Sequence, residues 1–227
     1  MIEGLKETLD DFHIIPNDIS LYEMAFTHAS YSNEHQQCQS YDRLEFLGDS
    51  ILDMVIGDLV YHHYPKDNSG TLSKARSALV EGKTLTNLAE SVYGFSSLVR
   101  YSEGEKNNTG HHNKIHEDVF EAFMGAVYLD QGYEFVRNLI INIFEPLLDV
   151  ALKVSKERDS KGRLQEYMNG AVINYVVVSQ TNLGTDNCHF VVEARLGNDV
   201  LGCGEGHNKK EAEIDAARDA LSKKVGE

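Results

Sequence analysis

Two stretches of the sequence carry carboxylate pairs at helical spacing. DRLEFLGDSIL contains Glu45 and Asp49, four positions apart, and HEDVFEAFMGAVYLD contains Asp118 and Glu121, three positions apart. These spacings place the two side chains of each pair on one face of a helix. If the two helices pack together, four carboxylates converge, and an oxygen-only set suits a hard divalent cation such as Mg2+. The chemistry that such a site supports is metal-dependent phosphodiester hydrolysis.

Acidic pairs of this kind are also common on solvated helix faces, so each pair alone has a simpler explanation. Asp42 lies on the same side as the first pair, and like charges placed this way repel by roughly a few tenths of a kcal/mol per pair. A bound cation offsets that repulsion. Gly48 and small residues near each pair suggest that the two backbones approach closely. Asp53 and Asp58, by contrast, are assigned to a solvated face.

Two further patterns resemble functional motifs only superficially. Five histidines lack an HExxH arrangement, so most of them are predicted to be surface or loop residues and not zinc ligands: His62, His63, His111, His112 and His116. GCGEG, residues 202–206, is glycine-rich but is not followed by the GK[ST] of a phosphate-binding loop. We interpret it as the turn between a β-hairpin and a helix.

The hydrophobic pattern divides the chain into a helical part and a mixed tail. From about Ile2 to Leu152, apolar residues recur every three to four positions, which predicts helices. In the tail, INYVVVSQT and CHFVVEARL alternate and are rich in β-branched residues, which predicts strands between a short and a long helix. The predicted fold is an all-α domain, residues 1–153, a polar linker, 154–160, and a small α+β domain of α-β-β-β-α order, 161–227.

Charge weighs against nucleic-acid binding at first sight, because the formal net charge is -15 and phosphate contacts need Lys and Arg. The charge is uneven, however. Residues 1–159 contain 13 Lys and Arg against 26 Asp and Glu, whereas residues 160–227 contain 8 against 10. Lys209 and Lys210 begin the last helix, where cations oppose the helix dipole, and this favours phosphates docked at that end. The alternative is two solvated lysines beside Glu211 and Glu213.

The remaining composition predicts a protein of the reducing cytoplasm. The three cysteines form no CxxC motif, which argues against a disulfide framework or a zinc knuckle. No run approaches the ~18 apolar residues of a membrane span. The first residues, MIEGLKETLDDFHIIP, lack the basic and apolar regions of a secretory signal.

The two acidic stretches together closely resemble the signature of the ribonuclease III family. LYEMAFTHASYSNE and LSKARSALVEGKTL resemble other parts of that family's nuclease domain. The tail, with LQEYM and GEGHNKKEAEIDAARDAL, resembles a double-stranded-RNA-binding domain. The resemblance covers nearly the whole chain and implies a bacterial-type ribonuclease III, with an all-α endonuclease domain followed by a small RNA-binding domain.

The resemblance also implies an activity and its partners. The family works as a cytoplasmic homodimer that uses Mg2+, with Mn2+ as a substitute, and needs neither a nucleotide cofactor nor a membrane. It cleaves double-stranded RNA to 5′-phosphate and 3′-hydroxyl ends with short 3′ overhangs, and it processes ribosomal RNA precursors and some messenger RNAs. The alternatives are a non-catalytic double-stranded-RNA-binding protein on the same scaffold and a metal phosphohydrolase that acts on small molecules.

Roles for single residues follow from the same resemblance. Four carboxylates match the family's divalent-metal ligands: Glu45, Asp49, Asp118 and Glu121. Of these, Asp49 and Glu121 match the two whose loss most affects catalysis. Four residues of the tail match RNA contacts, the first two in the minor groove and the last two on phosphates: Gln165, Glu166, Lys209 and Lys210.

The sequence departs from the family pattern at three places. Asp42 stands where most members have Glu, and the stretch NSGTLSK lacks glutamates that are often found there. In the tail, LGTDNCHF replaces the usual Gly-Pro-x-His contact, with Asp186 in the place of the histidine. We therefore expect a weaker RNA grip in that loop.

Overall fold

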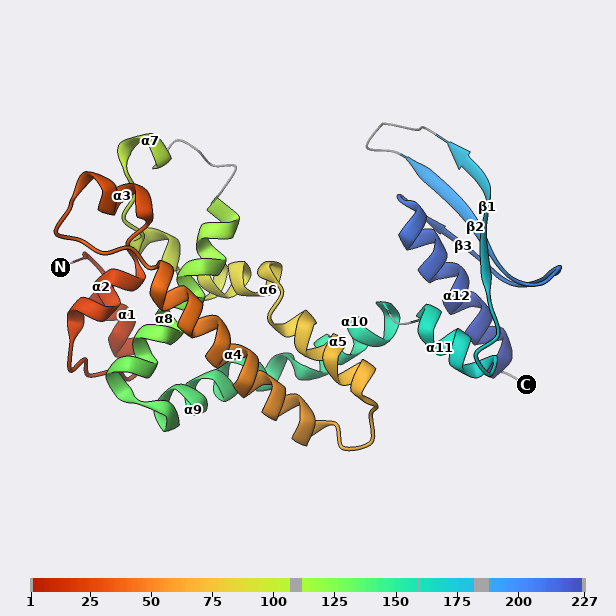
Figure 1. Ribbon diagram of the computed structural model, residues 1–227, viewed down its shortest axis with the longest axis horizontal. Helices are drawn as coiled ribbons and strands as arrows, with labels where there is room; N and C mark the ends of the chain where they lie inside the picture. The colour runs from red at the N-terminus through yellow and green to blue at the C-terminus, as the bar shows by residue number, and fades with distance from the viewer. Residues whose placement is uncertain (1, 107–111, 159, 182–187, 226–227) are drawn as a thin grey trace. The chain divides into compact units, whose positions relative to one another are not determined.

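The structure is a computed structural model that describes residues 2–106, 112–158, 160–181 and 188–225. Contacts between Cα atoms divide the chain into two compact units, Met1–Ala151 and Leu152–Glu227 (Figure 1). The first unit is helical, and the second combines helices with a small sheet. This confirms the predicted fold class.

The first unit consists of helices of very different lengths. Within the described residues these are α1 (Leu5–Asp11), α2 (Ile19–Ala25), α3 (Ala29–Glu34), α4 (Asp42–His63), α5 (Ser69–Leu79), α6 (Gly82–Asn87), the π-helix η1 (Leu88–Val92), the 3-10 helix η2 (Phe95–Leu98), α7 (Glu103–Lys106), α8 (His112–Gln131), α9 (Tyr133–Phe144), the 3-10 helix η4 (Glu145–Leu147) and α10 (Leu148–Arg158), which passes into the second unit. Of these described helices, α4 and α8 are the longest.

Helix α8 forms the centre of the first unit. Every residue from Asp118 to Val127 is buried, as expected for a helix that is surrounded by others. Phe123 on α8 lies 5.1 Å from Phe12, 5.0 Å from Phe95 and 6.0 Å from Phe26, measured between ring centroids. These aromatic contacts fix α8 against the N-terminal helices and the segment around η2.

Helices α4 and α8 cross with their backbones in contact (Figure 1). A Cβ atom added to Gly48 would lie 1.7 Å from the carbonyl oxygen of Glu121, and one added to Gly125 would lie 2.3 Å from the carbonyl oxygen of Leu44. Only glycine fits at both positions, because any side chain would overlap the facing backbone. The close approach predicted at Gly48 is therefore present.

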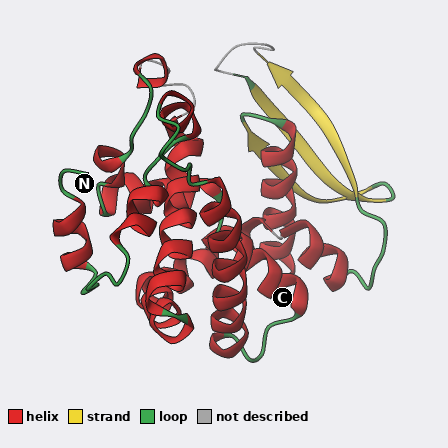
Figure 2. Ribbon diagram, turned by 60° about the vertical axis from the view of Figure 1, so that its left-hand side comes forward, coloured by secondary structure: helices red, strands yellow, loops and turns green. Residues whose placement is uncertain are grey.

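The second unit is a three-stranded antiparallel sheet with helices packed against it (Figure 2). Its elements are α11 (Ser160–Tyr167), β1 (Asn174–Thr181), β2 (His189–Leu196), β3 (Asp199–Gly206) and α12 (Lys209–Val225). The strand order is β1-β2-β3, with Val177 opposite Val192 and Phe190 opposite Gly206. Leu164 of α11 completes the core between the sheet and α12.

The GCGEG stretch is part of strand β3, so its interpretation as a turn is wrong. Gly202, Gly204 and Gly206 alternate along β3 toward α12. A Cβ on Gly204 would lie 2.0 Å from the backbone nitrogen of Ala216, and one on Gly202 would lie 2.5 Å from that of Ala220. The glycines therefore let the helix lie on the strand, and the alanines of α12 do the same from the other side.

The polar stretch interpreted as a linker has helical backbone on both sides of position 159. Helix α10 continues to Arg158, and α11 begins at Ser160. The physical reason is composition, because Lys, Glu and Arg are strong helix formers and the stretch contains no Pro. The boundaries of the two domains stay a prediction.

Candidate metal centre and nucleic-acid interface

The contact between Gly48 and the backbone of α8 brings the two acidic pairs together. Helix α4 supplies Glu45 and Asp49, and helix α8 supplies Asp118 and Glu121. Glu45, Asp118 and Glu121 each place a carboxylate oxygen within 4.8 Å of the others. Asp118 and Glu121 are buried and Glu45 is half-buried. Three carboxylates thus converge from two helices.

Asp49 does not belong to this group of three, although the sequence resemblance predicts it as a ligand. Its side chain is exposed on α4. Its charge nevertheless acts on the group, because burial and then the nearby Asp49 carboxylate raise the pKa of Glu121 to about 8. Its assignment as a metal ligand stays a prediction.

Negative charge is crowded in the cluster. Burial, and next the charge of Asp118, raises the pKa of Glu45. The buried Tyr41 hydroxyl donates toward Asp118 Oδ2 at 3.4 Å. Buried carboxylates that raise one another's pKa favour a neutralising partner, and three oxygen donors at this spacing fit a hard divalent cation. The donor set is therefore chemically suited to Mg2+.

Lys114 is the basic side chain that contacts this cluster. Its Nζ lies 2.7 Å from Asp118 Oδ1 and 3.3 Å from Glu117 Oε1. A polar hollow of about 450 Å3 opens beside it, and Lys83, Asn87 and Asn113 are among its lining residues. Lys114 lies four positions before Asp118 in the sequence, and sequence reasoning gave Glu117 and Tyr41 no role. For Glu117, the signal was its spacing of three positions from Lys114.

Among the described residues, the histidines of α4 and α8 and the carboxylates Asp53 and Asp58 do not belong to the three-carboxylate group. His62 and His63 are exposed at the end of α4, as predicted. His116 is buried, with its Nδ1 3.7 Å from Glu90 Oε2, and is an exception to the surface placement that was predicted for most of the five. His111 and the side chain of His112 lie outside the described residues. Asp53 and Asp58 lie on a solvated face as expected, with 46% and 44% of their side chains exposed, and each also pairs with an arginine: Asp53 with Arg76 at 3.8 Å and Asp58 with Arg137 at 3.3 Å.

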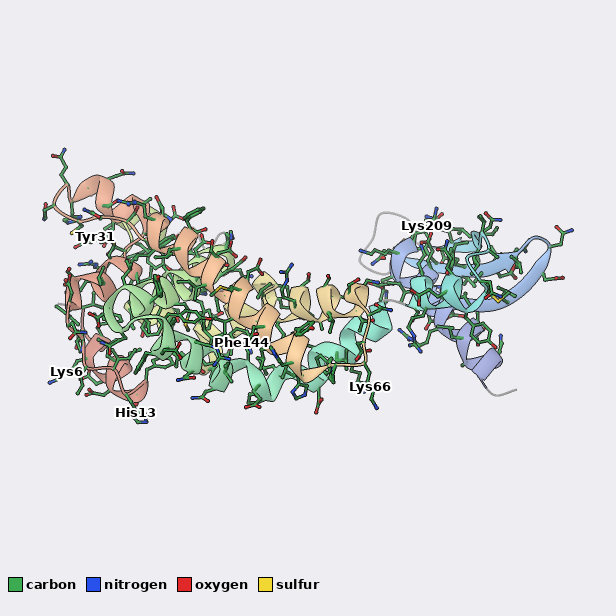
Figure 3. All side chains as sticks on the ribbon, turned by 60° about the horizontal axis from the view of Figure 1, so that its bottom comes forward. Lys6, His13, Tyr31, Lys66, Phe144 and Lys209 are labelled. Carbon is green, nitrogen blue, oxygen red and sulfur yellow. The ribbon has the colours of Figure 1, made fainter. Side chains whose placement is uncertain are left out.

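The residues matched to RNA contacts are exposed in the second unit. Gln165 and Glu166 lie on α11 with exposed side chains. The preceding residue, Leu164, is buried in the core of this unit. Lys209 and Lys210 are exposed in the first turn of α12, and Figure 3 labels Lys209. Their roles stay predictions.

The start of α12 is capped without these lysines. Asn208 Oδ1 accepts a hydrogen bond from the backbone nitrogen of Glu211 at 2.9 Å, and Glu211 Oε2 accepts one from that of His207 at 3.0 Å. Neighbours supply the cap, and a lysine ammonium group, which has no acceptor, cannot contribute to it. Lys209 Nζ lies 3.9 Å from Glu213 Oε1, which is a weak pairing. Asp186 lies outside the described residues.

Comparisons with known proteins agree with this organisation. The family profile described as "Ribonuclease-III-like" matches residues 18–147, and that of the "Double-stranded RNA binding motif" matches residues 160–224. The chain is 40% identical to "Ribonuclease 3" of Lactobacillus acidophilus over 96% of both chains. It is 37% identical to "Ribonuclease 3" of Ligilactobacillus salivarius, over 98% of this chain and 99% of that one.

Solved structures give the same likeness for the first unit. The nuclease domain of ribonuclease III from Campylobacter jejuni is 33% identical with a TM-score of 0.58, and the match covers 63% of this chain and 96% of that domain. The Campylobacter jejuni domain is described as structurally flexible in a region involved in dimer formation. Within the described part of the chain, every helix is too short or too polar to cross a membrane.

Proposed function

The chain belongs to the ribonuclease III family of double-stranded-RNA endonucleases, and from that premise we propose that its cleavage is divalent-metal-dependent hydrolysis. The proposed products have 5′-phosphate and 3′-hydroxyl ends with short 3′ overhangs. The observation that carries this proposal is the convergence of Glu45, Asp118 and Glu121 within 4.8 Å at the crossing of α4 and α8.

The proposed cation is Mg2+, for which Mn2+ can substitute. Glu45, Asp118 and Glu121 would hold it, with Asp49 as the fourth carboxylate. A divalent cation held by these residues would supply an activated water and stabilisation of the departing 3′ oxygen. The protein's own contribution is to fix the carboxylates: two are buried on α8, and Tyr41 orients Asp118. Loss of Asp49 or Glu121 should impair catalysis most.

The second unit is proposed to bind the RNA duplex by shape. A-form RNA exposes 2′-hydroxyl groups in a wide minor groove, which suits the polar Gln165 and Glu166 on α11. The exposed Lys209 and Lys210 suit the phosphates. The natural substrates that we propose are ribosomal RNA precursors and some messenger RNAs, processed in the cytoplasm.

The working form is proposed to be a homodimer of first units. Phe46 on α4 is 77% exposed, which is unusual for a large apolar side chain. An apolar hollow of about 260 Å3 opens on the same helix, lined by Leu21, Met24, Gln39, Arg43, Leu44, Leu47 and Leu129. A two-fold interface between identical chains needs a self-complementary surface, and an exposed aromatic side chain with an apolar hollow on the same helix would suit one. The related Campylobacter jejuni domain, which has a region involved in dimer formation, supports this interpretation.

The test uses a labelled RNA duplex of about 30 base pairs, roughly twice the ~16 base pairs that one domain of this kind spans. Wild type and Glu121→Gln are compared with and without Mg2+. We expect the wild type to cut only with the metal and to leave 3′ overhangs, while the variant binds the duplex without cutting it. A wild type that binds the duplex but never cuts it would instead be a non-catalytic RNA-binding protein.

A further inference from the structure

Lys114 contacts the metal centre but has no part in the reaction proposed above. Its Nζ bridges Asp118, a member of the carboxylate cluster, and Glu117, which lies outside it. These acids follow Lys114 by four and three positions, so all three side chains share one face of α8. The positive charge also acts beyond its contacts, since it opposes the effect of burial on the pKa values of Glu45 and Glu121. One ammonium group therefore acts on all three clustered carboxylates.

Glu117 is more buried than the lysine that it contacts. Its side chain is 22% exposed, whereas that of Lys114 is 62% exposed. Its carboxylate lies against the first residue of α6, because a Cβ on Gly82 would be 2.3 Å from Glu117 Oε2. A lysine has a flexible stem and three rotatable donors, so its ammonium can leave one acid and keep the other. The adjoining polar hollow, which both side chains line, gives it room to do so.

We propose that Lys114 is a built-in counter-cation of the carboxylate cluster that competes with the divalent cation for Asp118, and that Glu117 retains the ammonium when the cation binds. The inference rests on the proposed function, in which these carboxylates bind a metal. A divalent cation displaces the ammonium from Asp118 because it carries twice the charge and contacts several carboxylates at once. Lys114 then limits repulsion among the acids when no metal is bound, and it lowers the affinity for the metal. Lys114 acts through the carboxylates and takes no direct part in the cleavage reaction.

Calorimetric titration of the full chain with Mg2+ alone, without RNA, tests the competition. Lys114→Met should bind Mg2+ about tenfold more tightly than wild type, because a neighbouring positive charge is gone. Its melting temperature without Mg2+ should fall below that of wild type. The matched control is Lys106→Met, since Lys106 is similarly exposed and pairs with Glu103 on α7 at 2.6 Å. The control should leave Mg2+ affinity unchanged.

Unchanged or weaker Mg2+ binding by Lys114→Met would overturn the inference and leave the proposed function standing. If Lys114→Met showed this binding and also cleaved RNA more slowly than wild type, Lys114 would instead act at the scissile phosphate. A wild-type chain that binds no Mg2+ would contradict the metal dependence itself, and the competition with it. The outcomes of the two proposals are therefore distinguishable.

A double-mutant cycle tests the part played by Glu117. Glu117→Gln should weaken Mg2+ binding in the wild-type chain, because Lys114 then pairs with Asp118 alone and competes more strongly. In the Lys114→Met background the same substitution should have a clearly smaller effect, since only the lost negative charge remains. Equal effects in the two backgrounds would show that Glu117 acts through its charge and does not retain Lys114.

Discussion

At the scale of single residues, the proton on Glu121 couples metal binding to pH. Burial, and then the charge of Asp49, raises its pKa to about 8, so the metal-free protein carries this proton at neutral pH. A metal ligand must be deprotonated, and the cation therefore has to displace the proton. We expect Mg2+ affinity to fall as pH drops below 8, by about tenfold per pH unit.

Calorimetry at neutral pH, in two buffers of different ionisation enthalpy, measures this proton directly. Wild type should release about one proton per bound Mg2+. Asp53→Asn, on the outer side of α4, should release the same amount, whereas Glu121→Gln should release much less. Mg2+ binding by wild type without proton release would contradict the prediction.

The stability of the metal-free chain changes with pH in the opposite direction to its Mg2+ affinity. Its free energy of unfolding should fall as pH rises from 4.5 through about 8, because Glu121 ionises in the unfolded chain before it ionises in the folded one.

At the scale of elements, the crossing of α4 and α8 decides whether the carboxylates meet. Gly48→Ala would place a methyl group 1.7 Å from a carbonyl oxygen of α8, so the helices must separate. We expect a loss of several kcal/mol in the free energy of unfolding, on the order of a severe core substitution, together with loss of Mg2+ binding. Denaturant unfolding and Mg2+ titration measure both effects.

Gly57→Ala on the same helix is the matched control. A methyl group there would lie 3.8 Å from the Cδ of Arg76, which is an ordinary contact. Because alanine favours a helix over glycine by about 1 kcal/mol, this variant should be as stable as wild type or more so. Equal stability of Gly48→Ala and Gly57→Ala would mean that the helices do not touch where the structure has them.

Local spacing made the helices and their acids predictable, since three- and four-residue spacings fix which side chains share a face. Gly48 indicated a close approach of two backbones, because glycine has no side chain to keep them apart. The contact of Tyr41 with Asp118 was not predictable, because it depends on how separate segments pack. The bridge from Lys114 to Glu117 has a three-residue spacing on one helix, and sequence reasoning could have found it but gave it no role. GCGEG was misread because glycine permits turns and also close packing, and the sequence alone does not say which one a given glycine serves.

At the scale of the whole molecule, the excess of acid and the binding of RNA are compatible. The net charge is -15, but residues 160–227 are nearly balanced, with 8 basic against 10 acidic residues. The acidic excess lies in the part that holds the carboxylate cluster, where the proposed cation would neutralise some of it. RNA binding should therefore weaken as monovalent salt rises and should depend on Mg2+ as well.

The proposed homodimer can be tested by a substitution at Phe46. If Phe46 of each chain enters the apolar hollow of its partner, Phe46→Asp places a charge in a buried apolar site and should convert the dimer to a monomer. Val92→Asp is the control, because Val92 is also an exposed apolar residue, on η1 and outside that hollow. Light scattering after size-exclusion chromatography should give twice the mass of one chain for wild type and the control, and a single mass for Phe46→Asp. A wild type that has the mass of one chain would contradict the homodimer, and duplex cleavage would then have to proceed one strand at a time.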